Sequence, residues 1–439
     1  MGGERSRDHR DIAKGDSVDL ETIPQQARER IEKISKADLL VGVLADHAND
    51  APAMVRQALA GFNETPRTVV FQGDHVAASP NGADAGSVDS GAAQEEGVFV
   101  VPWTLLSPDA SVSPVQSMAN AYQFILAAGD KLGVQACCIV GSDLQTVTSE
   151  WISRLVQPIL QGGFDLVTPC YAHGKFEGLL NSSLISPLNR ALYGTRLQNP
   201  LGPDLSMSRS MFQRMLGAEQ GNKPAGSQTR TLASLAPTAI CGGFKICQAY
   251  LGPRTFPPTD WTNLSSLLVQ VLGPIFLDVE RNATCWQRAR PPVSPPIVGE
   301  RMMMAEDKGA VDVRRMLELF QLGARDLPEI WGLVLPPTSL IELRKLSRLQ
   351  PDQFRMPDDL WVHIVYDFAL GYRLRTISRD HLLRAMTPLY LGWVASHSLE
   401  MENAPARAVE QRLERLCHVF EANRSYLVSR WRWPDRFNP

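Results

Sequence analysis

An aspartate lies directly after an apolar run that has the pattern of a buried strand. Asp143 belongs to the turn 141–145 (GSDLQ), between the run 136–140 and a helical pattern. In open α/β sheets ligands gather at the carboxyl ends of the strands, where a carboxylate can hold a divalent cation that neutralises a diphosphate. Asp143 could instead cap the turn or the next helix, and its residue type favours neither role.

Two further segments carry polar groups beyond strand or turn patterns. In residues 168–178 (TPCYAHGKFEG), Lys175 could bind an anionic acceptor, although the segment could equally be an ordinary solvated connection. In residues 199–206 (NPLGPDLS), proline and glycine constrain the backbone, so the Asp204 carboxylate is held in one direction. The alternative is that Asp204 or a nearby serine caps the following helix.

The elements that would position these residues are those of an α/β domain. Helical patterns alternate with strand candidates, which predicts a mostly parallel sheet flanked by helices. The strand candidates are 39–45, 68–71, 98–101, 136–140 and 165–168. The clearest helix is 151–160, with Thr148 as its cap and Gly162 at its end. Helix-spaced apolar residues over 360–372 and 409–420 predict a helical C-terminal part.

Composition limits the classes of function. The 439 residues are 44% hydrophobic and 21% charged, which supports a sizeable core and disfavours wholesale disorder. A net charge of -3 with scattered basic residues argues against nucleic-acid binding and favours a small polar ligand. The polar start of the chain lacks a signal-peptide core, and no apolar run reaches the roughly 20 residues of a membrane span, so we expect a cytoplasmic protein.

The cysteines and the missing motifs exclude several chemistries. The seven cysteines form no CxxC or Cys/His spacing, so we expect buried, reduced thiols. The sequence contains no dinucleotide-binding glycine loop, no Walker loop, no GxSxG elbow and no HExxH zinc helix. A dehydrogenase, an NTPase, an α/β hydrolase and a zincin are therefore each disfavoured.

A series of motifs resembles the mannosylglycerate synthase and glucosyl-3-phosphoglycerate synthase group of glycosyltransferases in both order and spacing. The motifs are IVGSDL (139–144), EWI (150–152), FDLVTPCY (164–171), SPL (186–188), ALYG (191–194), PLGPD (200–204), GGFKICQAYLGP (242–253) and PLYLG (388–392). The resemblance spans roughly residues 37–433. It implies an α/β, A-type glycosyltransferase domain (37–295) after a flexible tail (1–36), followed by a helical C-terminal domain (296–439).

The resemblance also implies a reaction and its participants. A hexose would pass from a nucleotide-diphosphate sugar to a small hydroxylated acceptor, such as a glycerate-type acid, with retention of configuration and with Mg²⁺ or Mn²⁺ as cofactor. Members of the group often dimerise, so we expect a homodimer. The implied roles are metal binding by Asp143, nucleotide binding by Asp46 and Asp74, acceptor binding by Lys175, Glu177 and Asn181, and a catalytic role for Asp204.

Several positions differ from the group's pattern. Gly141 stands where the group has the first aspartate of an Asp-x-Asp pair, and Arg254 stands where many members have a metal-binding histidine. The acceptor loop reads EGLLN (177–181) and lacks the usual two threonines. These differences keep a second interpretation open, a non-catalytic pseudo-glycosyltransferase that serves as a binding or scaffolding module.

Overall fold

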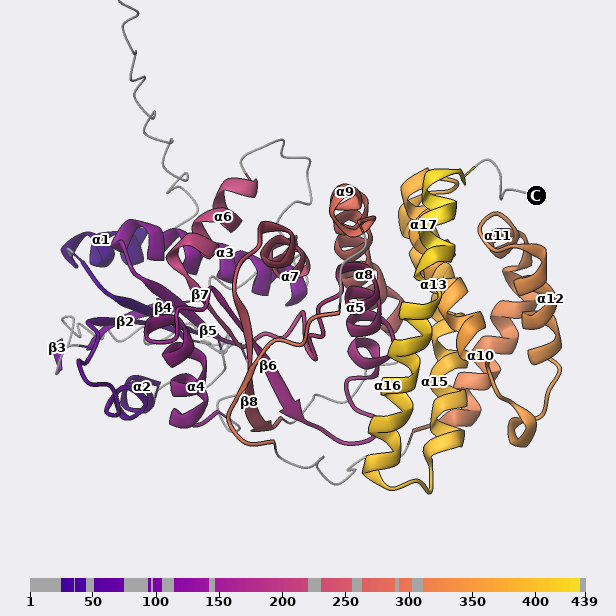
Figure 1. The fold of residues 1–439 in the computed structure, drawn as a ribbon, viewed down its shortest axis with the longest axis horizontal. Helices are drawn as coiled ribbons and strands as arrows, with labels where there is room; N and C mark the ends of the chain where they lie inside the picture. The colour runs from indigo at the N-terminus through magenta and orange to yellow at the C-terminus, as the bar shows by residue number, and fades with distance from the viewer. Residues whose placement is uncertain are drawn as a thin grey trace, which may run out of the picture.

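A computed structural model gives the architecture of the chain. It describes residues 25–34, 36–44, 51–74, 94–95, 98–104, 114–141, 147–219, 230–254, 263–288, 292–301 and 311–434. An α/β part with a central sheet lies beside a part made of long helices (Figure 1). Within the described residues, no helix is long and apolar enough to cross a membrane.

The sheet has nine strands in the order β3-β4-β2-β1-β5-β7-β6-β8-β9. The strands are β1 (Leu39–Val43), β2 (Thr68–Asp74), β3 (Gln94–Glu95), β4 (Val98–Thr104), β5 (Ala136–Val140), β6 (Leu166–Ala172), β7 (Leu205–Ser208), β8 (Ile246–Pro253) and β9 (Ile297–Val298). β7 is antiparallel to both of its neighbours, and β3 is antiparallel to β4. The remaining pairs are parallel, so the predicted mostly parallel sheet is confirmed.

The predicted strands form because their apolar runs are buried on both faces. All residues of β1, β5 and β6 are buried, as expected for a parallel sheet covered by helices. Two central strands were not predicted. β8 lies in the motif 242–253, which carries the resemblance but has no separate strand prediction, and the four residues of β7 follow a constrained turn that predicts entry into a helix.

Helices cover both faces of the sheet (Figure 1). α1 (Gln25–Lys33), α3 (Pro114–Leu132), α6 (Arg209–Glu219) and α7 (Arg230–Gly242) pack on one face, and α2 (Ala51–Leu59) and α4 (Ser149–Leu160) pack on the other. α4 confirms the predicted helix. Thr148 is its N-cap residue, although its side chain makes no capping hydrogen bond.

The second part is a helical bundle with a large apolar core. Its elements are η3 (Asn181–Ile185), α5 (Ser186–Tyr193), α8 (Leu264–Arg281), α9 (Ala283–Trp286), α10 (Val313–Asp326), α11 (Pro328–Gly332), α12 (Pro337–Leu346), η5 (Pro351–Gln353), α13 (Asp358–Leu374), α14 (Arg379–Ala385), α15 (Thr387–Met401), α16 (Ala406–Ala422) and α17 (Arg424–Arg432). α13 and α16 confirm the predicted C-terminal helices. η3, α5, α8 and α9 share this core although they precede residue 296, so the helical packing extends beyond the C-terminal segment.

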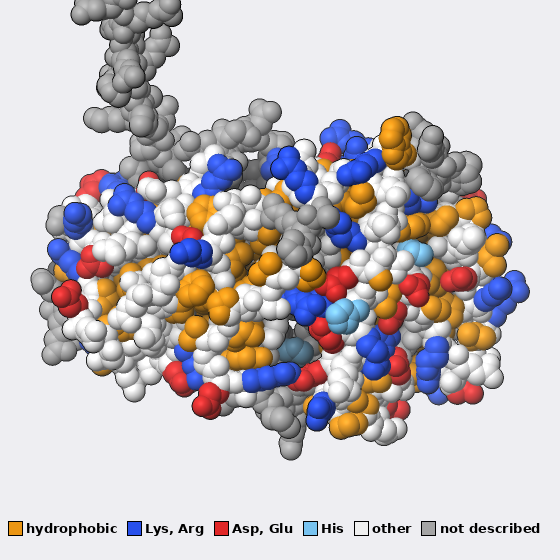
Figure 2. Space-filling model, in the orientation of Figure 1, with side chains coloured by type: hydrophobic (Ala, Val, Ile, Leu, Met, Phe, Trp, Pro, Cys, Tyr) orange, Lys and Arg blue, Asp and Glu red, His pale blue; other side chains and the backbone are white. Residues whose placement is uncertain are grey.

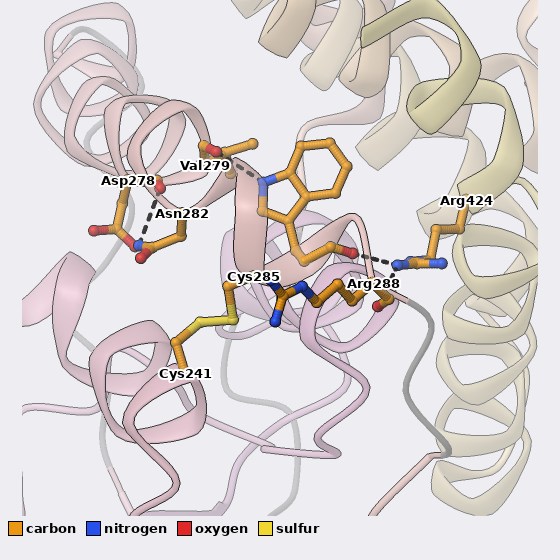
Figure 3. Close-up of a disulfide and its surroundings, with 8 residues drawn as sticks. Cys241, Asp278, Val279, Asn282, Cys285, Arg288 and Arg424 are labelled. Atoms are coloured by element: carbon orange, nitrogen blue, oxygen red, sulfur yellow. Dashed lines mark hydrogen bonds between the residues drawn. A yellow bond between two sulfur atoms is a disulfide. The ribbon is translucent and has the colours of Figure 1, made fainter. Parts of the chain in front are cut away.

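A disulfide joins Cys241 at the end of α7 to Cys285 in α9 (Figure 3). The expectation that every cysteine is a reduced thiol is wrong for this pair. The two residues are 44 positions apart in sequence, but the packing of α7 against α8 brings their Cα atoms to 6.0 Å, within the range that a disulfide requires. The other five cysteines are buried free thiols, as expected.

Candidate functional site

Four chain segments meet at one edge of the sheet. β5, β6 and β8 end there, and β7 begins there because it runs in the opposite direction. The topology therefore brings together Gly141 after β5, Tyr171 near the end of β6, Asp204 before β7 and Arg254 after β8. In open α/β sheets this is the edge where ligands bind.

Asp204 links these segments through its carboxylate, which is completely buried. Its Oδ1 accepts a hydrogen bond of 2.9 Å from the Gly141 N–H. Its Oδ2 accepts a hydrogen bond from the Tyr171 hydroxyl at 2.5 Å. Asp204 therefore holds the ends of β5 and β6 in a fixed relation to the start of β7.

Two buried tyrosines complete this network. The Tyr122 hydroxyl, from α3, donates to the carbonyl oxygen of Pro203. Burial raises the pKa of both Tyr122 and Tyr171, the nearby Asp204 charge raises it further, and Arg254 opposes the shift. Both phenols are therefore neutral hydrogen-bond donors at ordinary pH.

Arg254 brings a positive charge to the same edge. Its backbone N–H donates to the carbonyl oxygen of Ala172 at 3.1 Å, which fixes the start of its side chain beside the end of β6. Its guanidinium carbon lies 5.0 Å from the ring centroid of Tyr171. A guanidinium over an aromatic face is a favourable arrangement that restricts the motion of the arginine head group.

Tyr171, near the end of β6, lines a cavity of about 350 Å³ whose other lining residues come from the sheet, the helical bundle and the segments between them. Basic, acidic and histidine side chains gather around a hollow where the two parts meet (Figure 2). The polar residues that line the cavity include His173, Asn181, Arg190, Arg196, Gln198, Gln248, Tyr250, Arg301, Glu410 and Glu414.

The three arginines of the cavity differ in their partners. Arg190 pairs with Glu414 at 2.8 Å and Glu421 at 2.7 Å; burial opposes its charge, but the hydrogen bonds to these carboxylates hold its pKa above the ordinary value. Arg301 pairs with Glu410 at 2.5 Å. The Nε of Arg196 is buried, and among the described residues it has no hydrogen-bond partner. Arg196 is therefore the best-placed cation for an anionic ligand.

The predicted acceptor residues lie in different surroundings. Asn181 lines the cavity and donates to the Gln198 carbonyl at 2.8 Å. Lys175 donates to the carbonyl oxygen of Glu402 at 3.4 Å, and Glu177 accepts from the Gly174 N–H at 2.8 Å; neither residue lines the cavity. The structure thus brings only Asn181 of these three into the cavity.

Of the other predicted site residues, the structure describes the side chain of Asp204 but not those of Asp46, Asp74 and Asp143. Asp46 and Asp143 lie outside the described residues. Asp74 is the last residue of β2, and its side chain is likewise outside the described set. Asp204 lies at the sheet edge, where it accepts hydrogen bonds from the Gly141 N–H and the Tyr171 hydroxyl, and its catalytic role stays a prediction.

Sequence reasoning did not single out the cavity arginines. Arg190 lies between the matched motifs SPL and ALYG, and His173 lies in the segment noted for its polar groups. Arg196 and Arg301 come from separate stretches of chain that only the fold unites. No spacing in the sequence marks a cavity built from such distant segments.

The described residues do not fit a divalent-cation site at this edge. A Cβ at Gly141 would lie 2.9 Å from the Pro203 Cβ and 3.1 Å from its carbonyl oxygen, so a carboxylate side chain there would require Pro203 to move. Both Asp204 oxygens already accept hydrogen bonds. Across the part of the chain that the structure describes, no three His, Cys, Asp or Glu side chains form a group suited to a metal ion.

No protein-family model and no curated protein matches the chain. Similar solved structures include glucosyl-3-phosphoglycerate synthase from Mycobacterium tuberculosis, in complex with Mn²⁺, UDP-glucose and phosphoglyceric acid. Its identity is 18% and its TM-score 0.34, over 59% of this chain and 85% of that chain. Mannosyl-3-phosphoglycerate synthase from Rubrobacter xylanophilus is also similar, with 16% identity and a TM-score of 0.35, over 63% of this chain and 85% of that one.

The group of glycosyltransferases that the motifs resemble thus recurs among the similar solved structures. The observed architecture, an α/β domain in which antiparallel β7 lies between the parallel strands β5 and β6, followed by a helical C-terminal part, agrees with the predicted A-type glycosyltransferase fold class. At these identities and TM-scores the likeness identifies no substrate and no site residue of this chain.

Proposed function

We propose that the chain is a glycosyltransferase that moves a hexose from a nucleotide-diphosphate sugar to a small hydroxylated acid, with retention of configuration. The observation that carries the proposal is the position of the cavity. Tyr171 lines the cavity and its hydroxyl donates a hydrogen bond to Asp204 at the sheet edge, so a donor at that edge and an acceptor in the cavity would be neighbours.

The chemistry needs few reactive groups from the protein. The bond from the anomeric carbon to the diphosphate oxygen breaks and its electrons remain on the diphosphate. The acceptor oxygen bonds to that carbon, and its proton leaves to water. Such a transfer depends mainly on positioning and on electrostatic stabilisation of the leaving group.

The cavity suits an anionic acceptor. Arg196 lines the cavity, its buried Nε has no hydrogen-bond partner among the described residues, and Asn181, Gln198 and Tyr250 add neutral hydrogen-bonding groups. A carboxylate of the acceptor would bind Arg196 while its hydroxyl group faces the sheet edge. Lys175 and Glu177 belong to the loop beside this cavity, and their predicted acceptor role is part of the proposal.

The test is a matrix of UDP-glucose, GDP-glucose, UDP-mannose and GDP-mannose with glycerate and 3-phosphoglycerate, with products read by mass spectrometry. We expect one pair to give a glycosylated acid, and Arg196→Ala to raise the acceptor KM at least about 10-fold because a charge-assisted hydrogen bond is lost. The matched control is Arg344→Ala, which removes an exposed arginine on α12. Normal acceptor kinetics in Arg196→Ala would contradict this acceptor site.

A pseudo-glycosyltransferase is the second candidate, and the absence of room for a side chain at Gly141 favours it. It predicts that donor nucleotides bind but are neither transferred nor hydrolysed, even at high protein concentration. Detectable turnover of any donor would exclude it.

The remaining assignments extend the proposal. Asp46 and Asp74 would contact the nucleotide, and Asp143 would hold a divalent cation. A cytoplasmic location and a homodimer also remain predictions, of which the second is tested by light scattering on the purified chain.

A further inference from the structure

A diphosphate leaving group needs positive charge beside it, and the described residues at the sheet edge are poor ligands for a divalent cation. This inference rests on the proposed function. Another group at this edge must therefore supply the positive charge that stabilises the diphosphate.

The position after β5 is closed to a metal ligand. Gly141 packs against Pro203, and an added Cβ would also lie 3.4 Å from the Tyr122 hydroxyl oxygen. Pro203 is held in turn, because its carbonyl oxygen accepts the hydrogen bond from that hydroxyl. The packing that excludes a side chain is therefore built from buried, hydrogen-bonded neighbours.

The Asp204 carboxylate is equally unavailable. It has no exposed surface, and the Gly141 N–H and the Tyr171 hydroxyl occupy its two oxygens. Both donors are neutral, so the negative charge of Asp204 is solvated but not neutralised by them. That charge favours a cation at the same edge.

Arg254 is that cation. It directly follows β8, its backbone is bonded to Ala172, and its guanidinium lies over the Tyr171 ring. It lowers the pKa of both Tyr122 and Tyr171 against the larger effect of burial, so its field reaches across the Asp204 network. A guanidinium carries a permanent charge and several N–H donors whose geometry matches phosphate oxygens.

We propose that Arg254 supplies the positive charge for the nucleotide diphosphate, so that binding of the diphosphate does not depend on the divalent cation proposed at Asp143. The guanidinium would bind the diphosphate oxygens and stabilise the charge that they gain when the sugar leaves, without donating a proton. The two positions then complement each other. There is no room at Gly141 for a metal-binding side chain, and the Arg254 guanidinium supplies a positive charge at the same edge.

The experiment is titration calorimetry of the full chain with UDP and with GDP, in EDTA and in MnCl₂. We expect one nucleotide to bind in EDTA, with a Kd that Mn²⁺ changes by less than about 3-fold. Arg254→Ala should weaken binding in EDTA at least about 10-fold. Arg254→Lys should weaken binding less than Arg254→Ala, because lysine keeps the positive charge but lacks the paired N–H donors of the guanidinium.

Arg67→Ala is the matched control. Arg67 also lies over an aromatic ring, with its guanidinium carbon 4.9 Å from the Phe99 centroid, but it precedes β2 at the opposite edge of the sheet. Its loss should leave nucleotide binding unchanged.

The outcomes separate the inference from the proposed function. Binding that appears only with Mn²⁺, particularly if Asp143→Ala abolishes it, would overturn the role of Arg254 and leave the glycosyltransferase proposal intact. Unchanged affinity in Arg254→Ala would do the same. If neither nucleotide binds in either condition, the donor site itself is wrong and the inference fails with it.

Discussion

The sheet edge and the helical bundle both bury charged side chains, but they give them different partners. At the edge, Asp204 accepts hydrogen bonds from a backbone N–H and a tyrosine hydroxyl, which carry no charge. In the bundle, Arg412 bonds to Asp358 at 2.7 Å and to Glu400 at 2.8 Å, so the charges compensate one another.

This difference separates the proposed ligand site from a region that stabilises the packing of helices. The charges of Arg412, Asp358 and Glu400 largely cancel, so this cluster exerts little electrostatic attraction on a ligand. It serves mainly to fix the packing of α13, α15 and α16. A carboxylate that accepts hydrogen bonds from neutral donors keeps its charge and favours a cation nearby, and Arg254 lies beside this network. The comparison can be tested by removing groups from each region.

The largest effect on stability is expected from the disulfide that connects α7 with α9. Opening the link between Cys241 and Cys285 frees a loop of 44 residues, for which chain entropy gives about 4 kcal/mol. Cys241→Ser with Cys285→Ser should lower the free energy of unfolding accordingly in urea melts. Ellman titration of the unfolded wild-type protein should find five thiols, the number of free cysteines; a count of seven would contradict the disulfide.

Asp204→Ala should cost about 3 kcal/mol, because it leaves the Gly141 N–H and the Tyr171 hydroxyl buried without an acceptor. Asp204→Asn should cost less, since its amide oxygen still accepts one of these bonds. Both are measured by urea unfolding and by UDP and GDP affinity. A loss of stability without any change in affinity would place this network outside the binding site.

Arg412→Met should cost about 2 kcal/mol, because Asp358 and Glu400 are left partly buried without their cation. Nucleotide affinity should not change. Arg384→Met, which breaks an exposed pair with Asp380, is the control and should cost less than about 0.5 kcal/mol. If Arg412→Met weakened nucleotide binding, the proposed division of roles between the two regions would be wrong.

His397 gives the bundle a dependence on pH. Burial, with a smaller contribution from the Arg412 charge, lowers its pKa to about 4 from the ordinary value of 6.5. The unfolded chain therefore takes up a proton at a higher pH than the folded chain, and stability is lost as the pH falls from 6.5 toward 4. Between pH 6.5 and pH 5 this amounts to about 2 kcal/mol.

His397→Leu should remove this part of the pH dependence, as measured by urea unfolding at pH 5 and pH 7. The comparison with wild type isolates His397 from other groups that titrate in the same range. Equal slopes in the two proteins would show that the imidazole is not desolvated in the folded state.

Local sequence patterns were enough to predict the main strands of the sheet and several of the helices. β1, β5 and β6 are largely apolar runs, and α4, α13 and α16 show helical periodicity. Both patterns can be read from neighbouring residues alone. The turn before β7 likewise marked Asp204 as a carboxylate with a constrained backbone.

Only the tertiary structure decided what these residues do. The role of Asp204 depends on Tyr171, Gly141 and the reversed direction of β7, and a four-residue strand has too short a pattern to be detected alone. The cysteine pair, the cavity arginines and the place of Arg254 beside Tyr171 all join residues distant in sequence. Periodicity carries no information on such pairings, because they depend on how whole elements pack.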